Sequence, residues 1–147
     1  MAPGAAAITR GVRRALAQRG FASVTEFRLN GGRRADVLAV DADGVVVIVE
    51  VKSSVADFRS DRKWPEYRPW CDRFFFAVDE AFPADLIPAG CGLMVADAFG
   101  AAVVREAPEE RLAAARRKAL VLRVALTAAA RLHRVEDPGF TPDQASV

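Results

Sequence analysis

Apolar side chains near the start of the chain recur at the spacing of an α-helix. The stripe consists of Ile8, Val12, Ala15 and Leu16. Such a repeat is typical of an amphipathic helix, and Gly20 is a natural place for it to end. The pattern therefore predicts a first helix of about fourteen residues with arginines on its outer face.

Three β-strands are predicted after this helix. They cover residues 24–29, 36–40 and 45–52. Glycine-containing turns at 30–32 and 41–44 separate them. The third strand is apolar on both faces as far as Glu50, so we expect it to lie at the centre of a sheet that is covered on both sides.

The second half of the chain predicts further strands between helices. Ser53 or Ser54 can cap a short helix that runs to about Arg62. Residues 73–78 predict another core strand, 86–87 a short segment between prolines, and 92–96 with 101–105 a closing hairpin.

A long C-terminal helix is expected to open at Pro108, Glu109 and Glu110, because acids in a first turn complement the helix dipole. Its expected core-facing stripe is Leu112, Ala115, Ala119, Leu122 and Leu126. Residues 119–130 are apolar almost all round, which predicts that this segment is well buried.

The order of these elements defines the expected fold class. The core order α-β-β-β-α-β, followed by a hairpin and a long helix, predicts an α/β (α+β) domain with one mixed sheet of about four to six strands flanked by helices. We expect a single domain over residues 1–135 and a flexible tail over 136–147.

Composition limits the class of protein. The chain has 147 residues, of which 52% are hydrophobic, enough for one core. No apolar run of about eighteen residues predicts a membrane span, and the small apolar N-terminus precedes its arginines, the reverse of a secretory signal. Cys71 and Cys91 lack metal-site spacing and are expected to be reduced core residues. We therefore expect a cytoplasmic protein.

The net charge of +2 hides an uneven distribution. Residues 1–34 hold seven basic side chains and one acid, 35–110 hold seven and fifteen, and 111–147 hold seven and three. Basic ends around an acidic middle suit phosphate contacts beside a metal site. The alternative is that the arginine-rich helices are simply solvated faces.

Two acids and a lysine converge on the predicted hairpin. A three-residue loop at the 41–44 turn sets Asp36 directly opposite Glu50, with Cα atoms about 5 Å apart, whereas a one-residue change in loop length turns Asp36 to the other face. Glu50 and Lys52 share a face about 7 Å apart. Two close carboxylates repel each other unless a cation or a proton lies between them.

This arrangement has the residue types needed for metal-assisted phosphodiester hydrolysis. Mg²⁺ takes one or two carboxylates and completes its octahedron with waters and phosphate oxygens. It can polarise a phosphate and help to ionise a bound water, while Lys52 stabilises developing charge or positions that water. The alternative is that Glu50 and Lys52 are ordinary strand-end charges, since E-x-K is common.

Several stretches of the chain resemble a known family. Asp36 followed across a turn by Glu50-Val51-Lys52 resembles the D…E-x-K motif of the PD-(D/E)XK, restriction-endonuclease-like, nuclease superfamily. More closely, residues 8–105 resemble the bacterial MmcB-like DNA repair family in Thr9-Arg10-Gly11-Val12, Gly32-Arg33-Arg34-Ala35-Asp36, Glu50-Val51-Lys52-Ser53-Ser54, Asp57-Phe58, Asp61-Arg62-Lys63-Trp64-Pro65-Glu66-Tyr67 and Cys71-Asp72-Arg73-Phe74.

The resemblance implies roles for particular residues. Asp36, Glu50 and the carbonyl of Val51 would hold Mg²⁺ or Mn²⁺, and Lys52 would be the catalytic lysine. Many members of the superfamily carry a further acid on the first helix, where this chain has none; Glu26 is the candidate replacement, or else an exposed strand charge. Lys63 and Tyr67 occupy positions where one branch has glutamine and tyrosine, which leaves a two-metal mechanism open.

Other residues are candidates for nucleic-acid binding. The set is Arg10, Arg33, Arg34, Arg62, Lys63, Trp64 and Tyr67. Aromatic rings interleaved with basic side chains suit stacking on unpaired bases and contact with phosphates. The alternative for the rings is packing over the sheet. Asp57 and Asp61 are interpreted as partners of these arginines or as turn caps.

Three functions are distinguished at this point. The first is a Mg²⁺-dependent nuclease in DNA repair, with DNA as substrate, other repair proteins as candidate partners and a homodimer as a candidate assembly. The second is a nuclease-fold module that binds DNA or a repair partner and cuts little. The third, ranked last, is an interaction domain without a nucleic-acid role.

Overall fold

The stripe expected near the N-terminus lies on helix α1, Pro3–Gln18, in the computed structural model, which describes residues 3–142. Ile8, Val12 and Leu16 are buried against the sheet. Gly20 follows the helix with a φ of +86°, which a glycine adopts without strain. Gly11 lets α1 approach the β5–β6 turn, because a side chain there would collide with the backbone of residues 97 and 100.

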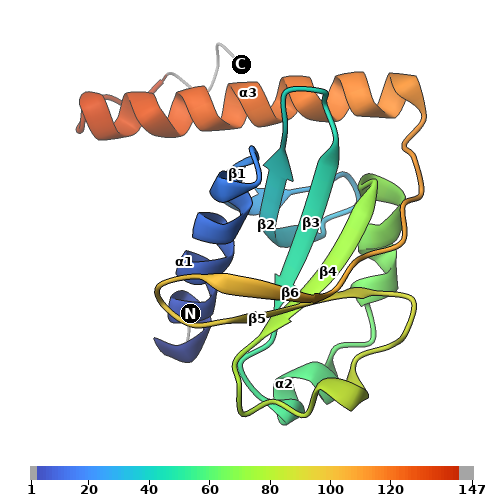
Figure 1. Ribbon diagram of the computed structural model, residues 1–147. Helices are drawn as coiled ribbons and strands as arrows, with labels where there is room; N and C mark the ends of the chain where they lie inside the picture. Colours follow the sequence, from blue (N-terminus) through green and yellow to red (C-terminus); the bar gives the residue numbers. More distant parts are fainter. Residues whose placement is uncertain (1–2, 143–147) are drawn as a thin grey trace.

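Six strands form one sheet in chain order, as Figure 1 shows. They are β1 Ala22–Arg28, β2 Arg34–Val40, β3 Val46–Val51, β4 Arg73–Val78, β5 Gly92–Ala96 and β6 Ala101–Arg105. β1, β2 and β3 pair antiparallel, β3, β4 and β5 pair parallel, and β6 closes antiparallel on β5. Every residue of β3 is buried. The mixed sheet and the central third strand are as the sequence predicts.

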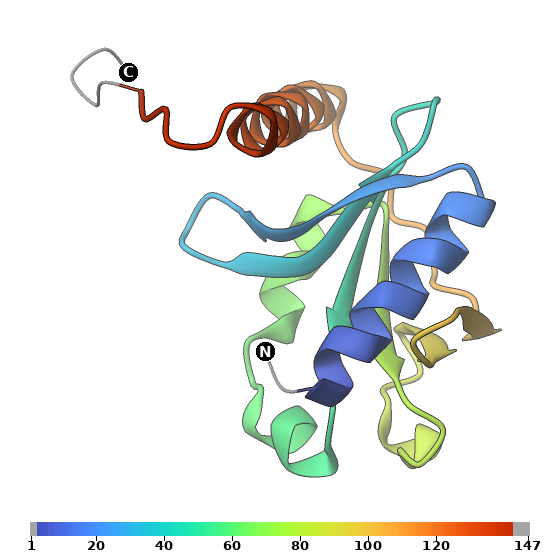
Figure 2. The ribbon, with the colours of Figure 1, turned by 90° about the vertical axis from the view of Figure 1, so that its left-hand side faces the viewer.

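Helical elements cover both faces of the sheet (Figures 1 and 2). α1 packs on one face, over a cluster that includes Val37, Val49 and Phe75. The second face holds a cluster that includes Leu38, Ile48 and Phe74. Its covering elements are α2 Val55–Ser60, the 3₁₀ helix η1 Trp64–Trp70 and α3 Ala114–Glu136. A short 3₁₀ turn, η2 Ala84–Leu86, lies between β4 and β5.

The connection from β3 to β4 is positioned by local hydrogen bonds. The Ser54 side chain accepts from the backbone N–H of Asp57 and caps α2, so of the two serines that the sequence offers as a cap, Ser54 is the one used. α2 ends at Ser60, two residues before the expected end. The following prolines are accommodated in η1 rather than in an α-helix, because an interior proline removes an α-helical hydrogen bond.

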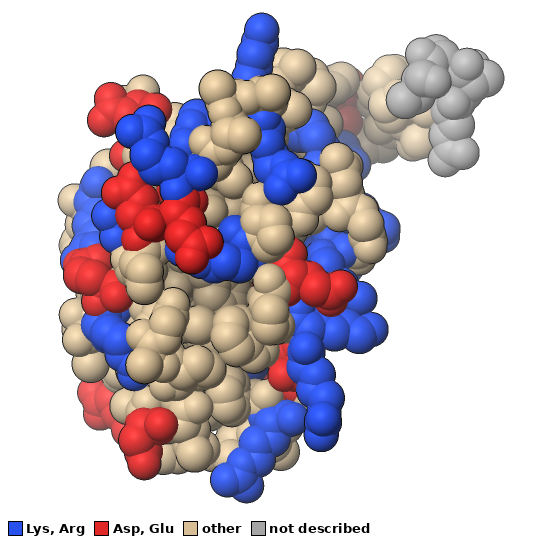
Figure 3. Space-filling model, turned by 90° about the vertical axis from the view of Figure 1, so that its right-hand side faces the viewer, with Lys and Arg blue, Asp and Glu red and all other residues tan. Residues whose placement is uncertain are grey.

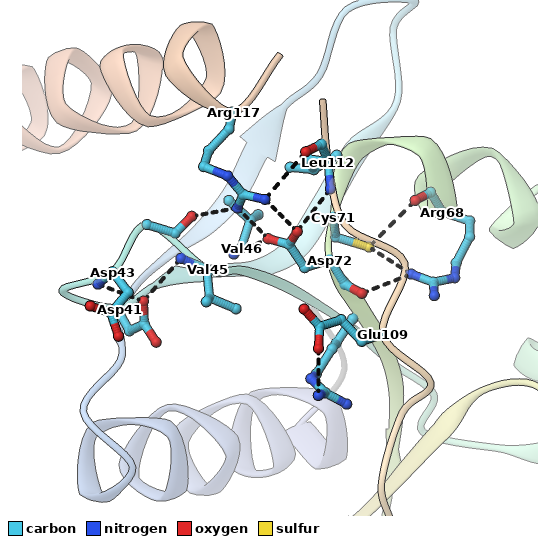
Figure 4. Close-up of polar contacts among 12 residues, drawn as sticks. Asp41, Asp43, Val45, Val46, Arg68, Cys71, Asp72, Glu109, Leu112 and Arg117 are labelled. Carbon is cyan, nitrogen blue, oxygen red and sulfur yellow. Dashed lines mark hydrogen bonds and ion pairs between the residues drawn. The ribbon is translucent and has the colours of Figure 1, made fainter. Parts of the chain in front are cut away.

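The C-terminal helix begins later than expected, at Ala114. The preceding segment is held in an extended course by Asp72. The backbone N–H of Glu110 donates to the Asp72 carbonyl, and that of Leu112 donates to its carboxylate. The Asp72 carboxylate also binds Arg117 through both terminal guanidinium nitrogens, at 2.6 and 2.7 Å (Figure 4). The N–H groups of Glu110 and Leu112 are therefore bound to Asp72, and this holds the segment out of the helix that was expected to start at residue 108.

The orientation predicted for this helix is wrong. Leu120 and Val124 face the core, whereas Leu122 and Leu126 are 59% and 63% exposed. The part of the expected stripe that lies in the helix, from Ala115 to Leu126, is therefore on the outer face, and residues 119–130 are not well buried. The physical reason is that arginines of α3 attach its inner side to the domain. Arg117 pairs with Asp72, and Arg123 and Arg131 donate to carbonyl oxygens of β1. Leu112 precedes the helix and packs, partly buried, against the core as predicted.

The remaining expectations concern the cysteines and the chain end. Cys71 and Cys91 are buried free thiols, and burial raises the pKa of Cys71 to about 12. The expected tail begins where α3 ends, and its last five residues lie outside the described residues. Within residues 3–142, no helix is both long and apolar enough to cross a membrane.

Candidate functional site

The β2–β3 hairpin brings Asp36 and Glu50 together in the predicted register. Val40 pairs with Val46 and Val37 with Val49, so one further step along the ladder sets Asp36 opposite Glu50. The backbone N–H of Asp41 donates to the carbonyl of Val45, which leaves a three-residue loop. Gly44 completes that loop with a φ of +80°, the left-handed residue that such hairpins favour.

Each carboxylate is held by the backbone of the opposite strand. The N–H of Val51 donates to Oδ2 of Asp36 at 2.9 Å. The N–H of Asp36 donates to Oε1 of Glu50 at 3.0 Å. These reciprocal bonds fix the two acids near the end of β3, on the face that carries Tyr67.

Burial sets the ionisation of the pair. Glu50 is only 4% exposed, and its burial together with the nearby charge of Asp36 raises its pKa to about 9. Burial also raises the pKa of Asp36. At neutral pH Glu50 therefore holds its proton, which relieves the repulsion between two close carboxyl groups.

Lys52 follows the pair and is bound by two acids of the α2 segment. Its Nζ lies 2.7 Å from Oδ2 of Asp61 and 3.9 Å from Oδ1 of Asp57, and the residue is 7% exposed. Burial alone would raise the pKa of Asp61, but the hydrogen bond and charge of Lys52, together with the N–H groups of Lys63 and Trp64, outweigh it and lower that pKa. The ammonium is thereby directed away from free solvent.

Asp57 and Asp61 are the residues whose role the sequence reasoning missed. The interpretation as arginine partners is wrong, because both pair with Lys52. The interpretation as turn caps is confirmed: Asp61 accepts from the N–H groups of Lys63 and Trp64. The available signal was their spacing of four, one helical turn, directly after the lysine.

The donor set fits a hard cation with few protein ligands. Asp36 and Glu50 supply carboxylate oxygens, and Val51 lies between Glu50 and Lys52 on the same strand. Among the described residues, no group of three or more acidic, histidine or cysteine side chains could hold a metal ion. Mg²⁺ needs only one or two carboxylates and takes the remainder of its octahedron from water and phosphate.

Glu26 is not brought to this site. It lines a groove between α1 and β1 together with Arg10 and Arg13, on the opposite face of the sheet from Tyr67. Its φ of +48° is uncommon for a residue other than glycine. Arg131 donates to the carbonyls of Thr25 and Glu26, which helps to hold this strained backbone. Arg10 shares that groove and is also remote from the two carboxylates.

The basic candidates near Asp36 lie at the surface. Arg34 is exposed at the start of β2, and Arg33 pairs with Glu66 at 3.3 Å. Arg62 and Lys63 are exposed after α2. Figure 3 shows a few lysine and arginine side chains at the lower right of this face, acids at its lower left and further lysine and arginine side chains near its top. These four cations can meet phosphate oxygens without rearrangement of the core.

The aromatic candidates are packed into the protein. Tyr67 is 8% exposed, stacks on Phe74 with ring centroids 6.2 Å apart, and donates its hydroxyl to the carbonyl of Arg34 at 2.9 Å. Trp64 stacks on the same Phe74 ring at 5.9 Å and meets Phe76 edge-on. The alternative of packing over the sheet therefore accounts for both rings, and Tyr67 supports the strand that carries Asp36.

Comparisons with known proteins agree with the resemblance to the MmcB-like family. The model of the family described as "DNA repair protein MmcB-like" matches residues 2–139. A solved structure described as the SPO1766 protein of unknown function from Silicibacter pomeroyi is 47% identical. It covers 96% of this chain and 97% of its own, with a TM-score of 0.92. No curated protein matches the chain.

Proposed function

Because the chain belongs to the MmcB-like family of DNA repair proteins, we propose that it hydrolyses DNA phosphodiester bonds at Asp36, Glu50 and Lys52 as a metal-dependent nuclease of the PD-(D/E)XK type. The observation that carries the proposal is the buried, facing pair of carboxyl groups. The proton that Glu50 holds is replaceable by a cation, and Lys52 is fixed close by through Asp61.

The two acids would bind Mg²⁺ or Mn²⁺ in place of that proton. Asp36 and Glu50 are already held by N–H groups of the opposite strand, so binding needs loss of the Glu50 proton rather than a change of backbone. The carbonyl of Val51 is the third protein group proposed to hold the ion. When bound, the metal supplies Lewis-acid activation of the phosphate and a more acidic water.

Lys52 would serve the phosphate that is cut. Asp57 and Asp61 hold its ammonium near the carboxylates, where it can stabilise charge that builds on the phosphate. The ion pair with Asp61 places the lysine before the substrate arrives, which lowers the entropic cost of orienting it. Arg33, Arg34, Arg62 and Lys63 would bind the flanking backbone phosphates.

A cleavage assay tests this proposal. Labelled duplex, single-stranded and branched DNA are incubated with Mg²⁺ or Mn²⁺ and the wild-type chain, Glu50→Gln or Lys52→Ala. Glu106→Gln and Lys118→Ala are matched controls, because both are exposed charges outside the site. We expect cleavage by the wild type and the controls alone. Cleavage that survives both site substitutions would refute the assignment.

A second function is favoured by how closed the site is. Glu50 and Lys52 are both less than a tenth exposed, and Lys52 is already neutralised by Asp61. A module that binds DNA through its surface cations and cuts little would have this character. Salt-sensitive DNA binding that Asp36→Ala leaves unchanged, without product on any substrate, would favour this alternative over the nuclease.

A further inference from the structure

The outer face of α3 carries an apolar stripe with the spacing of a helix–helix seam. Its members are Ala115, Ala119, Leu122, Leu126 and Ala129. The intervals alternate between four and three residues, the repeat that keeps one face of a helix against a partner helix. At a rise of 1.5 Å per residue the stripe is about 21 Å long.

This stripe points away from the domain. The residues of α3 that are buried, Leu120 and Val124, lie on the opposite side of the helix. Leu122 and Leu126 are 59% and 63% exposed, and Ala115, Ala119 and Ala129 are exposed as well. Exposed apolar residues in a continuous stripe mark interaction sites more often than scattered ones do.

The helix that presents the stripe is firmly attached. Arg117 forms a bidentate ion pair with the buried Asp72. Further along, Arg123 lies over the ring of Phe27 and donates to the carbonyl of Arg28. Arg131 donates to the carbonyls of Thr25 and Glu26. The outer face is therefore preformed, and a partner would not have to order it.

Its position leaves the candidate active site free. Figures 1 and 2 show α3 across one end of the sheet, whereas α2 lies at the other end. Lys52 pairs with acids of the α2 segment, so the site lies at that other end. A protein that docks on α3 would not cover the candidate active site.

The charges beside the stripe select the kind of partner. Arg116 and Lys118 flank it near its start, and residues 111–135 contain no acid. Arg116 donates to the carbonyl of Pro69, and no carboxylate among the described residues forms an ion pair with it or with Lys118. A second copy of α3 would set these cations against like charges, which flanking positions of paired helices disfavour.

We propose that the outer face of α3 docks an amphipathic helix of another protein, one whose apolar stripe is flanked by aspartate and glutamate. The apolar stripes supply contact area, and the acids meet Arg116 and Lys118. This docking surface is independent of whether the chain cuts DNA.

The test uses a synthetic helix as the probe. A fluorescent peptide carries leucine and alanine at the same four-three spacing with glutamate on both flanks, and its matched peptide carries lysine instead. Each is titrated into the whole protein and into the double variant Leu122→Gln with Leu126→Gln. Val135→Gln is the control, because Val135 is 77% exposed on the same helix but off the stripe.

We expect the acidic peptide to bind, with affinity that falls as salt is added. The double variant should weaken binding at least about tenfold, the scale of losing a well-packed apolar anchor, with its thermal unfolding unchanged. Val135→Gln should bind as the wild type does, and the lysine peptide should not bind.

Three results would overturn the proposal. One is absence of binding by the acidic peptide, and another is equal binding by the double variant. The third is a concentration-dependent dimer in sedimentation equilibrium that the double variant dissolves, since a second copy would then be the occupant.

Discussion

Two buried acidic centres lie at the two ends of strand β3, and they are compensated in opposite ways. The Asp72 carboxylate accepts a hydrogen bond of 2.8 Å from the N–H of Val46, the first residue of the strand. It also accepts from Leu112 and from both nitrogens of Arg117 (Figure 4). Although burial acts against ionisation, these bonds lower the pKa of Asp72 to about 2. In the Asp36–Glu50 pair, near the other end, Glu50 holds a proton instead.

The difference separates a structural acid from a candidate functional one. Asp72 has its cation within the chain, so its charge joins β3, the segment before α3 and α3 itself. The charge of the Asp36–Glu50 pair is compensated by no cation in contact with both acids among the described residues, since Lys52 is held by Asp57 and Asp61. A pair of close acids that no basic side chain contacts is suited to bind a metal ion.

The largest effect is expected from breaking the structural centre. Asp72→Ala leaves Arg117 without its partner and two N–H groups without their acceptor. Loss of one member of a buried ion pair costs about 3–5 kcal/mol, so the free energy of unfolding should fall by that amount in urea denaturation. Asp85→Ala, an exposed acid outside this network, is the control, and a loss no greater than in the control would contradict the assigned role.

Metal binding at the Asp36–Glu50 pair should raise the stability of the protein, whereas Asp72→Ala lowers it. A cation that binds only the folded protein stabilises it by about 2.7 kcal/mol at a hundred times its dissociation constant. Mn²⁺ should therefore raise the unfolding temperature of the wild type and of Asp72→Asn, but not of Glu50→Gln. Binding should tighten as pH rises toward 9, because Glu50 must lose its proton first. Equal stabilisation of Glu50→Gln would exclude the pair as the metal site.

Acid should weaken the structural centre within a narrow range of pH. The folded pKa of Asp72 is lowered to about 2, against about 3.9 in an unfolded chain, so its stabilisation of about 2–3 kcal/mol is fully present only above about pH 5 and is lost as pH falls toward 1. The difference in unfolding free energy between wild type and Asp72→Asn should shrink over this range. A difference that stays constant from pH 5 to pH 2 would contradict the lowered pKa; Asp85→Asn should follow the wild type throughout.

The smallest effect is expected from replacing the Glu50 carboxyl group by an amide in the absence of metal. The raised pKa of Glu50 means that folding favours its protonated form, so its stabilising contribution is lost as pH rises toward 9. Glu50→Gln removes this loss, and at pH 9 it should be more stable than the wild type by about 1 kcal/mol, the scale of one buried hydrogen bond. Denaturation at pH 5 and pH 9 checks this, since the gain should be absent at pH 5.

Local sequence rules were sufficient for the hairpin that carries the candidate site. The period of two along β3 places Glu50 and Lys52 on one face, and the turn before Val45 sets Asp36 opposite Glu50. These relations depend on neighbouring residues and on backbone geometry alone. The same holds for the Ser54 cap and for the buried face of α1.

Contacts between distant segments decided the rest. The two apolar sides of α3 are similar in sequence, and pairing of Arg117 with Asp72, 45 residues away, determines which side faces the core. Lys52 forms an ion pair with Asp61 instead of facing solvent, because α2 and the residue after it fold back beside the end of β3. The left-handed backbone conformation of Glu26 turns its side chain to the face of the sheet that α1 covers. The sequence by itself therefore determined the strands, their register and the acid pair, because those follow from local periodicity. Only the tertiary structure decided which charges are paired and which helix face remains open, because these depend on partners that are distant along the chain.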